Sequence, residues 1–374
     1  MIPNRRQLLA GTGAALAALP FRAHAASTSA RPQDRKRLLI LGGTGFLGPH
    51  VVAAAQARGW EITLFNRGRS DPGLFPDIET LIGDRDPEKG EGLGPLGDER
   101  TWDYVVDTTS YVPRLTRAVC ELLRGRVERY ALISTVSVYA SMAEHGVDEA
   151  SPVGVMPDPT NEDVRSYYGP LKALCEQAAE EVLPGQVANI RPGLIVGPRD
   201  KTDRFTYWPV RVREGGRVLA PGSIDDPVQC IDARDLAEFT VHCLAEGHLG
   251  VMNATGPSYG LTIGGLLYGC RAAVASDARF SWCPAETLER LGVQAWTDMP
   301  VWTPSEGPSR GHGTVSIAKA MAAGLTSRPL AETVGDTLTW WDGLPEERQT
   351  LRWGIDRERE QQALAALDGL SQEG

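Results

Sequence analysis

The sequence lacks any cluster of Lys and Arg residues interleaved with aromatic ones, and its acidic residues outnumber the basic ones by 48 to 38. Its formal net charge is −10, and it becomes −13 without residues 1–25, which contain three arginines and no acidic residue. A protein that binds a nucleic-acid backbone needs a basic face. The charge balance therefore argues against nucleic acid as a partner.

Long apolar runs are also missing, apart from a short one near the N-terminus. A membrane-spanning helix needs about 20 apolar residues, and no segment reaches that length. Residues 1–25 contain Arg5-Arg6, an apolar run over 8–19 and Ala23-His24-Ala25, which are small residues flanking an expected cleavage site. They resemble a twin-arginine signal peptide, which exports folded proteins. We expect a periplasmic or secreted protein without stable membrane association; a disordered leader or an uncleaved anchor is the alternative.

Closely spaced cysteines are absent as well. The six cysteines are scattered, with no CxxC pair and no spacing typical of metal ligands. An even number of cysteines in an exported protein leaves a disulfide open, but the chain is long enough to form a core without one. We therefore expect six structural thiols and no metal site.

The sequence does contain an alternation of short apolar segments and amphipathic segments from residue 36 onwards. Short buried strands that alternate with helices are typical of a parallel sheet covered on both faces. The pattern thus predicts an α/β fold with a doubly wound parallel sheet. The expected strands are 36–41, 61–65, 80–82, 104–107, 129–134 and 187–190, and the expected helices are 49–58, 114–123 and 166–182.

Beyond residue 193 the pattern becomes irregular and rich in aromatic residues, which indicates a smaller C-terminal substrate lobe. The charged, amphipathic tail from residue 346 is typical of a solvated surface helix. A loop as long as the acidic segment 141–165 more often lines a site than merely connects elements. The expected division is a signal peptide over 1–25, a nucleotide-binding domain over 36–192 and about 225–258, the substrate lobe over 193–224 and 259–341, and the helical tail over 342–374.

A glycine-rich turn follows the first expected strand, with glycines at positions 42, 45 and 48. Such glycines let the backbone approach a pyrophosphate, and the N-terminus of the following helix offers free N–H groups to the anion. A second strand ends about twenty residues later, as the motif requires. We predict a Rossmann-type dinucleotide site formed by Gly42, Gly45, Phe46, Leu47 and Gly48; an ordinary glycine-rich turn is the alternative.

The end of the second strand indicates which dinucleotide is bound. An NAD site usually has an acidic residue there for the ribose 2′-hydroxyl, whereas this sequence has Asn66 followed by Arg67. Because a guanidinium can neutralise a 2′-phosphate, the sequence favours NADP over NAD. Solvated loop residues are the alternative, above all for Arg69. Asp84, after the third strand, could bond the adenine amino group.

Tyr168 and Lys172 are four residues apart, so they share one face of the expected helix. Thr135 ends the fifth strand at the carboxyl edge of the sheet, where ligands bind. Hydride transfer from a carbinol requires a group that accepts its hydroxyl proton. A tyrosine normally stays protonated at neutral pH, because its pKa is about 10. A neighbouring ammonium and an oxidised nicotinamide would pull that pKa toward neutrality. We predict Tyr168 as acid/base, Lys172 as its electrostatic partner and ribose anchor, and Thr135 as the residue that holds the hydroxyl.

These motifs resemble the extended short-chain dehydrogenase/reductase family, also called the NAD-dependent epimerase/dehydratase family. The resemblance implies that the strand-five hydroxyl, the Tyr and the Lys carry out the chemistry, and that Pro192 lines the nicotinamide pocket. It also implies that a homodimer can form. The resemblance covers about residues 37–341 and rests on the glycine turn and on residues 133–139, 168–172, 191–198, 231–237 and 319–340.

The resemblance does not extend to the substrate. Nucleotide-sugar members generally clamp a pyrophosphate with basic residues, one of them just before the segment equivalent to 231–237. This chain has Pro227-Val228-Gln229 there, preceded by two aspartates, so we expect a different substrate. Arg310 is a candidate for a second basic position. Residues 203–208 are expected to border the pocket, although core packing would explain their aromatic residues equally well.

Taken together, the sequence predicts an NAD(P)-dependent oxidoreductase that acts on a secondary alcohol or ketone of a small, sugar-like molecule. The first alternative is a sugar epimerase or dehydratase that retains its NAD. A second alternative is a cofactor sensor or an RNA-associated relative without catalysis, because residues 64–68 (LFNRG) resemble some RNA-associated family members.

Overall fold

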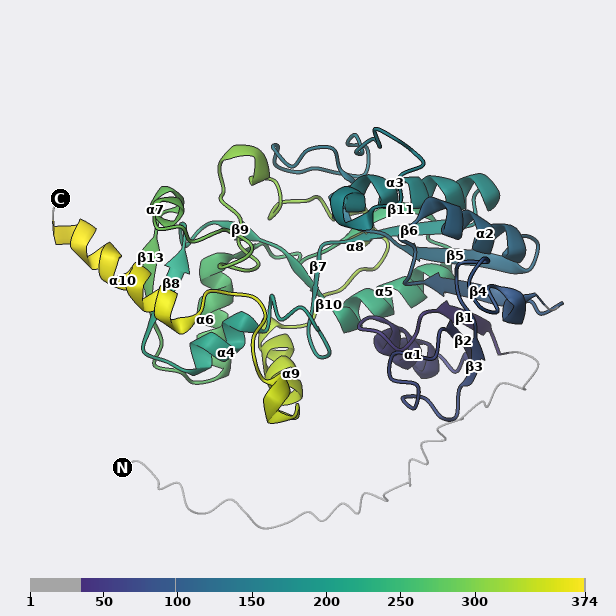
Figure 1. The fold of residues 1–374 in the computed structure, drawn as a ribbon, viewed down its shortest axis with the longest axis horizontal. Helices are drawn as coiled ribbons and strands as arrows, with labels where there is room; N and C mark the ends of the chain where they lie inside the picture. Colours follow the sequence, from purple (N-terminus) through teal and green to yellow (C-terminus); the bar gives the residue numbers. More distant parts are fainter. Residues whose placement is uncertain (1–34, 98, 373–374) are drawn as a thin grey trace, which may run out of the picture. The chain divides into compact units, whose positions relative to one another are not determined.

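A seven-stranded parallel sheet with the order β11-β6-β5-β4-β1-β2-β3 is the largest sheet of the described residues and lies on the right in Figure 1. The computed structural model describes residues 35–97 and 99–372, so the predicted signal peptide lies outside it. The sheet confirms the predicted Rossmann-type α/β fold, although the sequence pattern does not predict its edge strand β11. The strands are β1 (Arg37–Leu41), β2 (Glu61–Asn66), β3 (Glu79–Ile82), β4 (Trp102–Asp107), β5 (Val127–Ile133), β6 (Val187–Pro192) and β11 (Gly250–Ala254).

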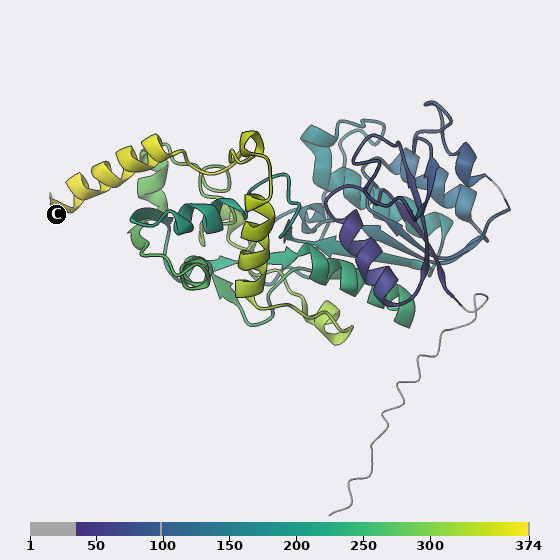
Figure 2. The ribbon, with the colours of Figure 1, turned by 90° about the horizontal axis from the view of Figure 1, so that it is seen from below.

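Helices cover both faces of the sheet (Figure 2), because successive side chains of each strand point to opposite faces. In β1, Leu38 and Ile40 pack with α1 (Gly48–Ala57) and α5 (Ala233–Glu246). Leu39 and Leu41 belong to the opposite core, which includes α2 (Pro113–Leu123) and α3 (Val164–Val182). This double burial explains why the strands are apolar without alternation.

The strand order creates a crevice at the carboxyl ends of the strands. The chain passes from β1 to β2 on one side and later to β4 on the other side of β1. Ligands of open α/β sheets bind at such a switch point.

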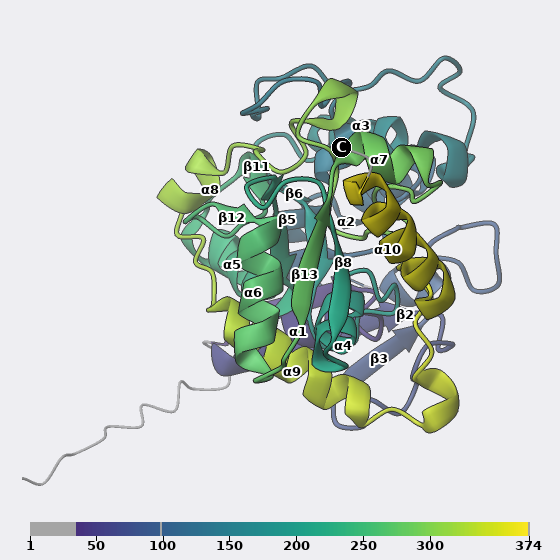
Figure 3. The same cartoon turned by 90° about the vertical axis from the view of Figure 1, so that its left-hand side faces the viewer.

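A second hydrophobic core lies among the elements that follow β6. Its two parallel strands, β8 and β13, lie side by side with α10 next to β8 (Figure 3). Phe205 and Trp208 are fully buried there. The remaining strands are β7 (Leu194–Val196), β8 (Arg217–Pro221), β9 (Pro227–Val228), β10 (Cys230–Asp232), β12 (Leu261–Thr262) and β13 (Arg279–Cys283). The remaining helices are α4 (Tyr207–Arg213), α6 (Ile263–Ala273), α7 (Ala285–Arg290), α8 (Ala318–Ala322), α9 (Leu330–Asp342) and α10 (Arg357–Gln372), with short 3₁₀ turns η2 (Gly94–Leu96), η3 (Val136–Val138), η4 (Gly307–Ser309) and η5 (Glu346–Arg348).

The C-terminal tail forms the predicted charged surface helix, α10, but one face of it is buried against the second core. Ile355 and Leu364 are buried in the second core. Glu360 of α10 is fully buried and pairs with Arg211 of α4, with Nε 2.8 Å from Oε2. A charged residue in the first turn of α10, Glu360, is thus packed in the interior through an ion pair, which the composition of the tail does not reveal.

All six cysteines are buried with free thiols, in agreement with the structural role expected for them. Within the described part of the chain, no helix is both long and apolar enough to cross a membrane.

Candidate active site

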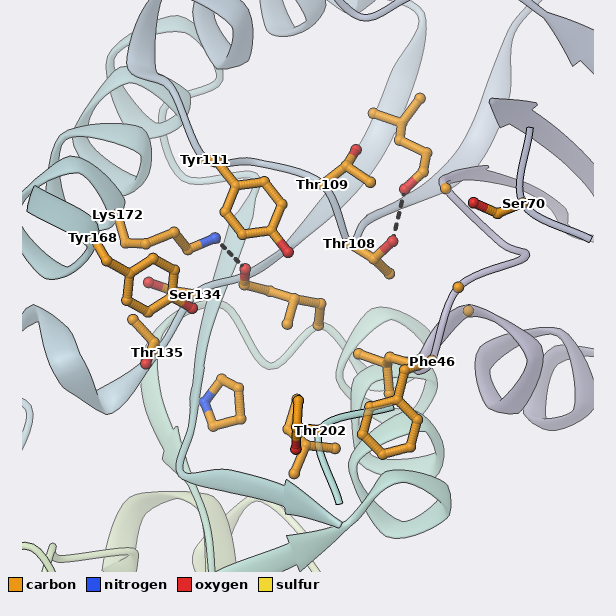
Figure 4. Close-up of a pocket in the computed structure, with 18 of the residues that line it drawn as sticks. Phe46, Ser70, Thr108, Thr109, Tyr111, Ser134, Thr135, Tyr168, Lys172 and Thr202 are labelled. Carbon is orange, nitrogen blue, oxygen red and sulfur yellow. Dashed lines mark hydrogen bonds between the residues drawn. The ribbon is translucent and has the colours of Figure 1, made fainter. Parts of the chain in front are cut away.

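One cavity of about 1300 Å³ lies at the carboxyl ends of β1, β2, β4, β5 and β6 (Figure 4). Pockets for small ligands measure about 300–1000 Å³, so this one has room for a dinucleotide together with a small substrate. All of the residues predicted for cofactor binding and for catalysis line it. They are Gly42, Gly45, Phe46, Leu47, Gly48, Asn66, Arg67, Asp84, Thr135, Tyr168, Lys172 and Pro192.

The glycine turn presents its backbone to the cavity. Gly42 and Gly43 have φ values of +116° and +94°, which glycine adopts readily. A Cβ on Gly48 would lie 2.5 Å from the Cα of Gly43, so α1 approaches the turn closely only without a side chain there. A Cβ on Gly45 would meet no atom of the described residues within 4 Å. The turn therefore combines exposed backbone with open space before a helix N-terminus, which is what a pyrophosphate requires.

The end of β2 forms the adjacent wall of the cavity. The Asn66 side chain accepts from the amide of Gly68 at 2.8 Å and donates to the carbonyl of Gly42 at 3.3 Å, so it fixes the turn. Arg67 is exposed and its guanidinium donates to no described residue. Arg69, for which a solvated position was the stronger expectation, lines the cavity as well. Two guanidinium groups are thus available beside the glycine turn.

Tyr168, Thr135 and Lys172 lie together on the opposite side of the cavity from Phe46 (Figure 4). Lys172 is 2% exposed, and its ammonium donates to the carbonyl oxygens of Ser110 and, at 2.6 Å, of Ile133. Thr135 follows β5, and its hydroxyl accepts an amide as the N-cap of η3. The structure thus brings the three predicted catalytic residues to one place.

The pKa of Tyr168 is raised by the protein alone. Burial raises the pKa of Tyr168, and Tyr111 acts in the same direction, whereas Thr135 and Arg204 oppose them. The ammonium of Lys172 donates to two carbonyl groups, and burial lowers its own pKa to about 8. The prediction also relied on the positive charge of an oxidised nicotinamide, which the chain itself does not supply.

The backbone of α3 aims Tyr168 into the cavity. Pro170 lies inside the helix and has no N–H to donate to the preceding turn. That turn contains Tyr167 in a non-helical conformation (φ −127°, ψ 32°). A Cβ on Gly169 would lie 2.0 Å from the carbonyl oxygen of Ser137. Gly169 therefore permits the close contact between α3 and the segment that follows β5.

A buried ion pair ties α3 to the neighbouring strands. Glu176 lies one turn after Lys172, and its Oε2 is 2.6 Å from Nη2 of Arg191 on β6. The hydroxyl of Ser134, at the end of β5, donates to the same carboxylate. All three polar groups are less than 10% exposed. This pair helps to fix α3 against β5 and β6, and with it the two side chains on α3 that are predicted to be catalytic.

Sequence reasoning missed several residues of the cavity. Thr108, Thr109 and Tyr111 follow β4, and the rule that ligands bind at carboxyl ends of strands could have found them. Arg204 and Trp296 come from the second core, where no local motif points to them.

Other expectations about the substrate side were wrong. Arg310 is not part of the cavity wall, and its Nη2 lies 2.9 Å from Oε2 of Glu144. The loop 141–165 contributes no residue to this cavity; its residues 153–156 line a separate groove of about 580 Å³. In the segment 203–208 only Arg204 reaches the cavity, while its aromatic residues pack in the second core.

Comparisons with known proteins agree with this fold. The model described as "NAD dependent epimerase/dehydratase family" matches residues 92–254. The chain is 26% identical over 239 residues to the epimerase family protein SDR39U1 of Bos taurus, covering 60% of this chain and 76% of that protein. It is 25% identical over 262 residues to the chloroplast stem-loop binding protein of 41 kDa b of Arabidopsis thaliana, covering 64% of each.

The solved structure of UDP-glucuronic acid 4-epimerase from Bacillus cereus, in complex with NAD, superposes with a TM-score of 0.57 at 16% identity. It covers 81% of this chain and 96% of that one. At this level of identity the likeness concerns the fold. The chain is therefore similar, in the sequence of residues 92–254 and in its Rossmann-type fold, to the NAD-dependent epimerase/dehydratase family, the extended short-chain dehydrogenases/reductases.

Proposed function

We propose that this protein is an extended short-chain dehydrogenase/reductase that uses NADP to interconvert a secondary alcohol and a ketone of a small molecule. The observation that carries the proposal is that one cavity joins the glycine turn to Tyr168, Lys172 and Thr135. When bound, the nicotinamide accepts a hydride in the oxidation and provides one in the reduction.

The side chains of the protein handle the accompanying proton. In the oxidation, the tyrosinate form of Tyr168 takes the proton of the carbinol hydroxyl, and in the reduction the phenol returns it. Thr135 holds the reacting oxygen from the end of β5. Lys172, fixed between two carbonyl groups, keeps one of its three N–H groups for the ribose of the cofactor. The backbone of the glycine turn and the N-terminus of α1 bind the pyrophosphate.

Filling the open space at Gly45 tests the proposed cofactor site. Because a Cβ there meets no described atom, Gly45→Val is expected to fold normally but to occupy the room of the pyrophosphate. We expect at least a 100-fold loss of NADPH affinity, measured by fluorescence titration, with an unchanged melting temperature. Mass spectrometry of denatured wild-type protein should detect a nicotinamide dinucleotide that the variant lacks. Gly73→Val, at another open position outside the cavity, is the control. Equal NADPH affinity in both variants would reject this binding site.

Arg67 provides the basis for the preference for NADP. Arg67→Ala should weaken NADP binding by about 1–3 kcal/mol, the cost of a lost charged hydrogen bond, and leave NAD binding nearly unchanged. Titrations of the variant with both cofactors measure the difference. Arg58→Ala, which changes the same charge at a position outside the cavity, is the control. Equal effects of Arg67→Ala on the two cofactors would mean that the guanidinium does not contact the 2′-phosphate.

We also infer that residues 1–25 direct export of the folded protein through the twin-arginine pathway, which would carry a cofactor bound in the cytoplasm to the periplasm or beyond.

A further inference from the structure

Arg204 brings a positive charge into the wall of the cavity near the catalytic tyrosine. It follows β7 and belongs to the part of the chain that forms the second core, yet its side chain lines the same cavity as Tyr168. The two groups are close enough for the guanidinium to oppose the raised pKa of the Tyr168 hydroxyl. A ligand at Tyr168 is therefore within the electrostatic reach of Arg204.

Two tryptophans hold the guanidinium in place without using its hydrogen bonds. The guanidinium carbon lies 5.6 Å from the ring centroid of Trp296 and 5.8 Å from that of Trp353. Cation–π contacts of this kind stabilise a charge but leave its N–H groups free. Nε donates to the hydroxyl of Thr202 at 3.1 Å. The two terminal nitrogens donate to no described residue. Because they are also not among the buried atoms that lack a partner, both are accessible from the cavity.

No carboxylate of the described residues forms an ion pair with Arg204, although Asp200 lies in the same wall. Asp200 is 1% exposed, and its Oδ1 accepts from the amide and the hydroxyl of Thr202, both at 2.8 Å. Burial lowers the pKa of Arg204. The charge of Asp200 acts on Arg204 only at a distance, without an ion pair, and a bound anion would give the half-buried guanidinium a direct partner.

The backbone around Arg204 is strained in the way that binding segments often are. Among the described residues, six other than glycine have positive φ, and four of these lie in the two segments that carry Arg204 and Trp296. They are Arg199 (+74°), Asp203 (+61°), Trp296 (+64°) and Val301 (+71°). Positive φ is most unfavourable for a β-branched residue such as Val301, which itself lines the cavity. Such strain persists where the surrounding structure holds it, commonly at ligand sites.

We propose that Arg204 binds a carboxylate of the substrate, so that the enzyme acts on a hydroxy acid or keto acid whose reacting carbon lies at Tyr168. This inference rests on the proposed function. A single guanidinium matches the single charge and the planar fork of a carboxylate. A phosphate carries about two negative charges. The second charge would have no cationic partner and would face the carboxylate of Asp200.

Fluorine NMR of protein labelled with 5-fluorotryptophan tests the proposal, because Trp296 and Trp353 report directly on Arg204. The NADP-loaded wild type is titrated with acetate, with acetamide as the uncharged match and with inorganic phosphate. The Trp296→Phe and Trp353→Phe variants assign the two resonances. We expect saturable shifts with acetate, none with acetamide, and binding at least tenfold weaker with phosphate.

Arg204→Gln should abolish the acetate response, Arg204→Lys should retain part of it, and Arg279→Gln, an exposed arginine on β13, should leave it unchanged. Absence of saturation in the wild type, an unaltered response in Arg204→Gln, or tighter binding of phosphate than of acetate would each overturn the carboxylate assignment. NADPH affinity is measured on every variant. Failure of the proposed function would appear there, as a wild type that binds no dinucleotide, and is thereby distinguished from failure of the anion site.

Discussion

Tyr168→Phe is expected to lower turnover by about 10²- to 10⁴-fold, the usual contribution of a positioned general acid or base. The change removes one oxygen and keeps the ring, which lies 6.4 Å from the ring of Tyr111 between centroids. NADPH affinity and the melting temperature should therefore stay at wild-type values. Turnover is measured as formation of reduced NADP with an alcohol, chosen from a panel of sugars and hydroxy acids, that the wild type oxidises.

The pH dependence of the oxidation gives a second readout of Tyr168. Because burial raises its pKa, only a small fraction is tyrosinate at neutral pH, and the rate of oxidation should increase as the pH rises toward that pKa. Tyr168→Phe should lose this increase. Tyr167→Phe, which removes a hydroxyl one residue earlier and outside the cavity, should retain both the rate and its pH profile. If Tyr168→Phe keeps turnover within tenfold of the wild type, another group transfers the proton.

The cofactor half of this site could be predicted because its determinants are local. Gly42, Gly45 and Gly48 are adjacent to the strand and the helix that they join, so spacing and flanking hydrophobicity are sufficient evidence. Tyr168 and Lys172 likewise share one helix, and the helical repeat places them on one face. In each case the residues that form the feature are neighbours in the sequence.

The substrate half could not be predicted, because its residues come from distant segments. Arg204 contacts Trp353, which lies in a tail that composition predicts to be solvated. Strand β11 was missed because the chain comes back to the sheet at this strand only after it has passed through the first elements of the second core. The sequence also pairs Lys172 with Tyr168 electrostatically, whereas the fold assigns its ammonium to two backbone carbonyls. These outcomes depend on tertiary contacts, which no local pattern contains.

Removing the carboxylate of Glu176 should produce a large loss of stability. Burial acts to lower the pKa of Arg191, and the hydrogen bonds and charge of Glu176 outweigh it and raise that pKa. Glu176→Leu removes the carboxylate that pairs with the buried Arg191 charge and leaves the ring of Tyr139 as its neighbour. Breaking such a pair from one side costs about 3–5 kcal/mol. Urea denaturation followed by circular dichroism measures the change in the free energy of unfolding.

The matched control is Glu121→Ala, an exposed acidic residue near the end of α2, which should change stability by no more than about 0.5 kcal/mol. A loss of less than about 1 kcal/mol for Glu176→Leu would contradict the buried ion pair, since a net effect of that size is typical of exposed pairs.

The double variant Glu176→Leu/Arg191→Leu separates the two consequences of this pair. Replacing both charges by apolar side chains of similar volume removes the uncompensated charge, so much of the lost stability should return. The bond from Ser134 to Glu176 remains broken, however, so α3 loses one of the polar contacts that hold it against the end of β5. Because Tyr168 and Lys172 lie on that helix, turnover should stay low, whereas NADPH affinity, which depends mainly on the turn before α1 and only in part on Lys172, should fall much less. A double variant that regains both stability and turnover would show that the pair stabilises the fold but does not position the catalytic helix.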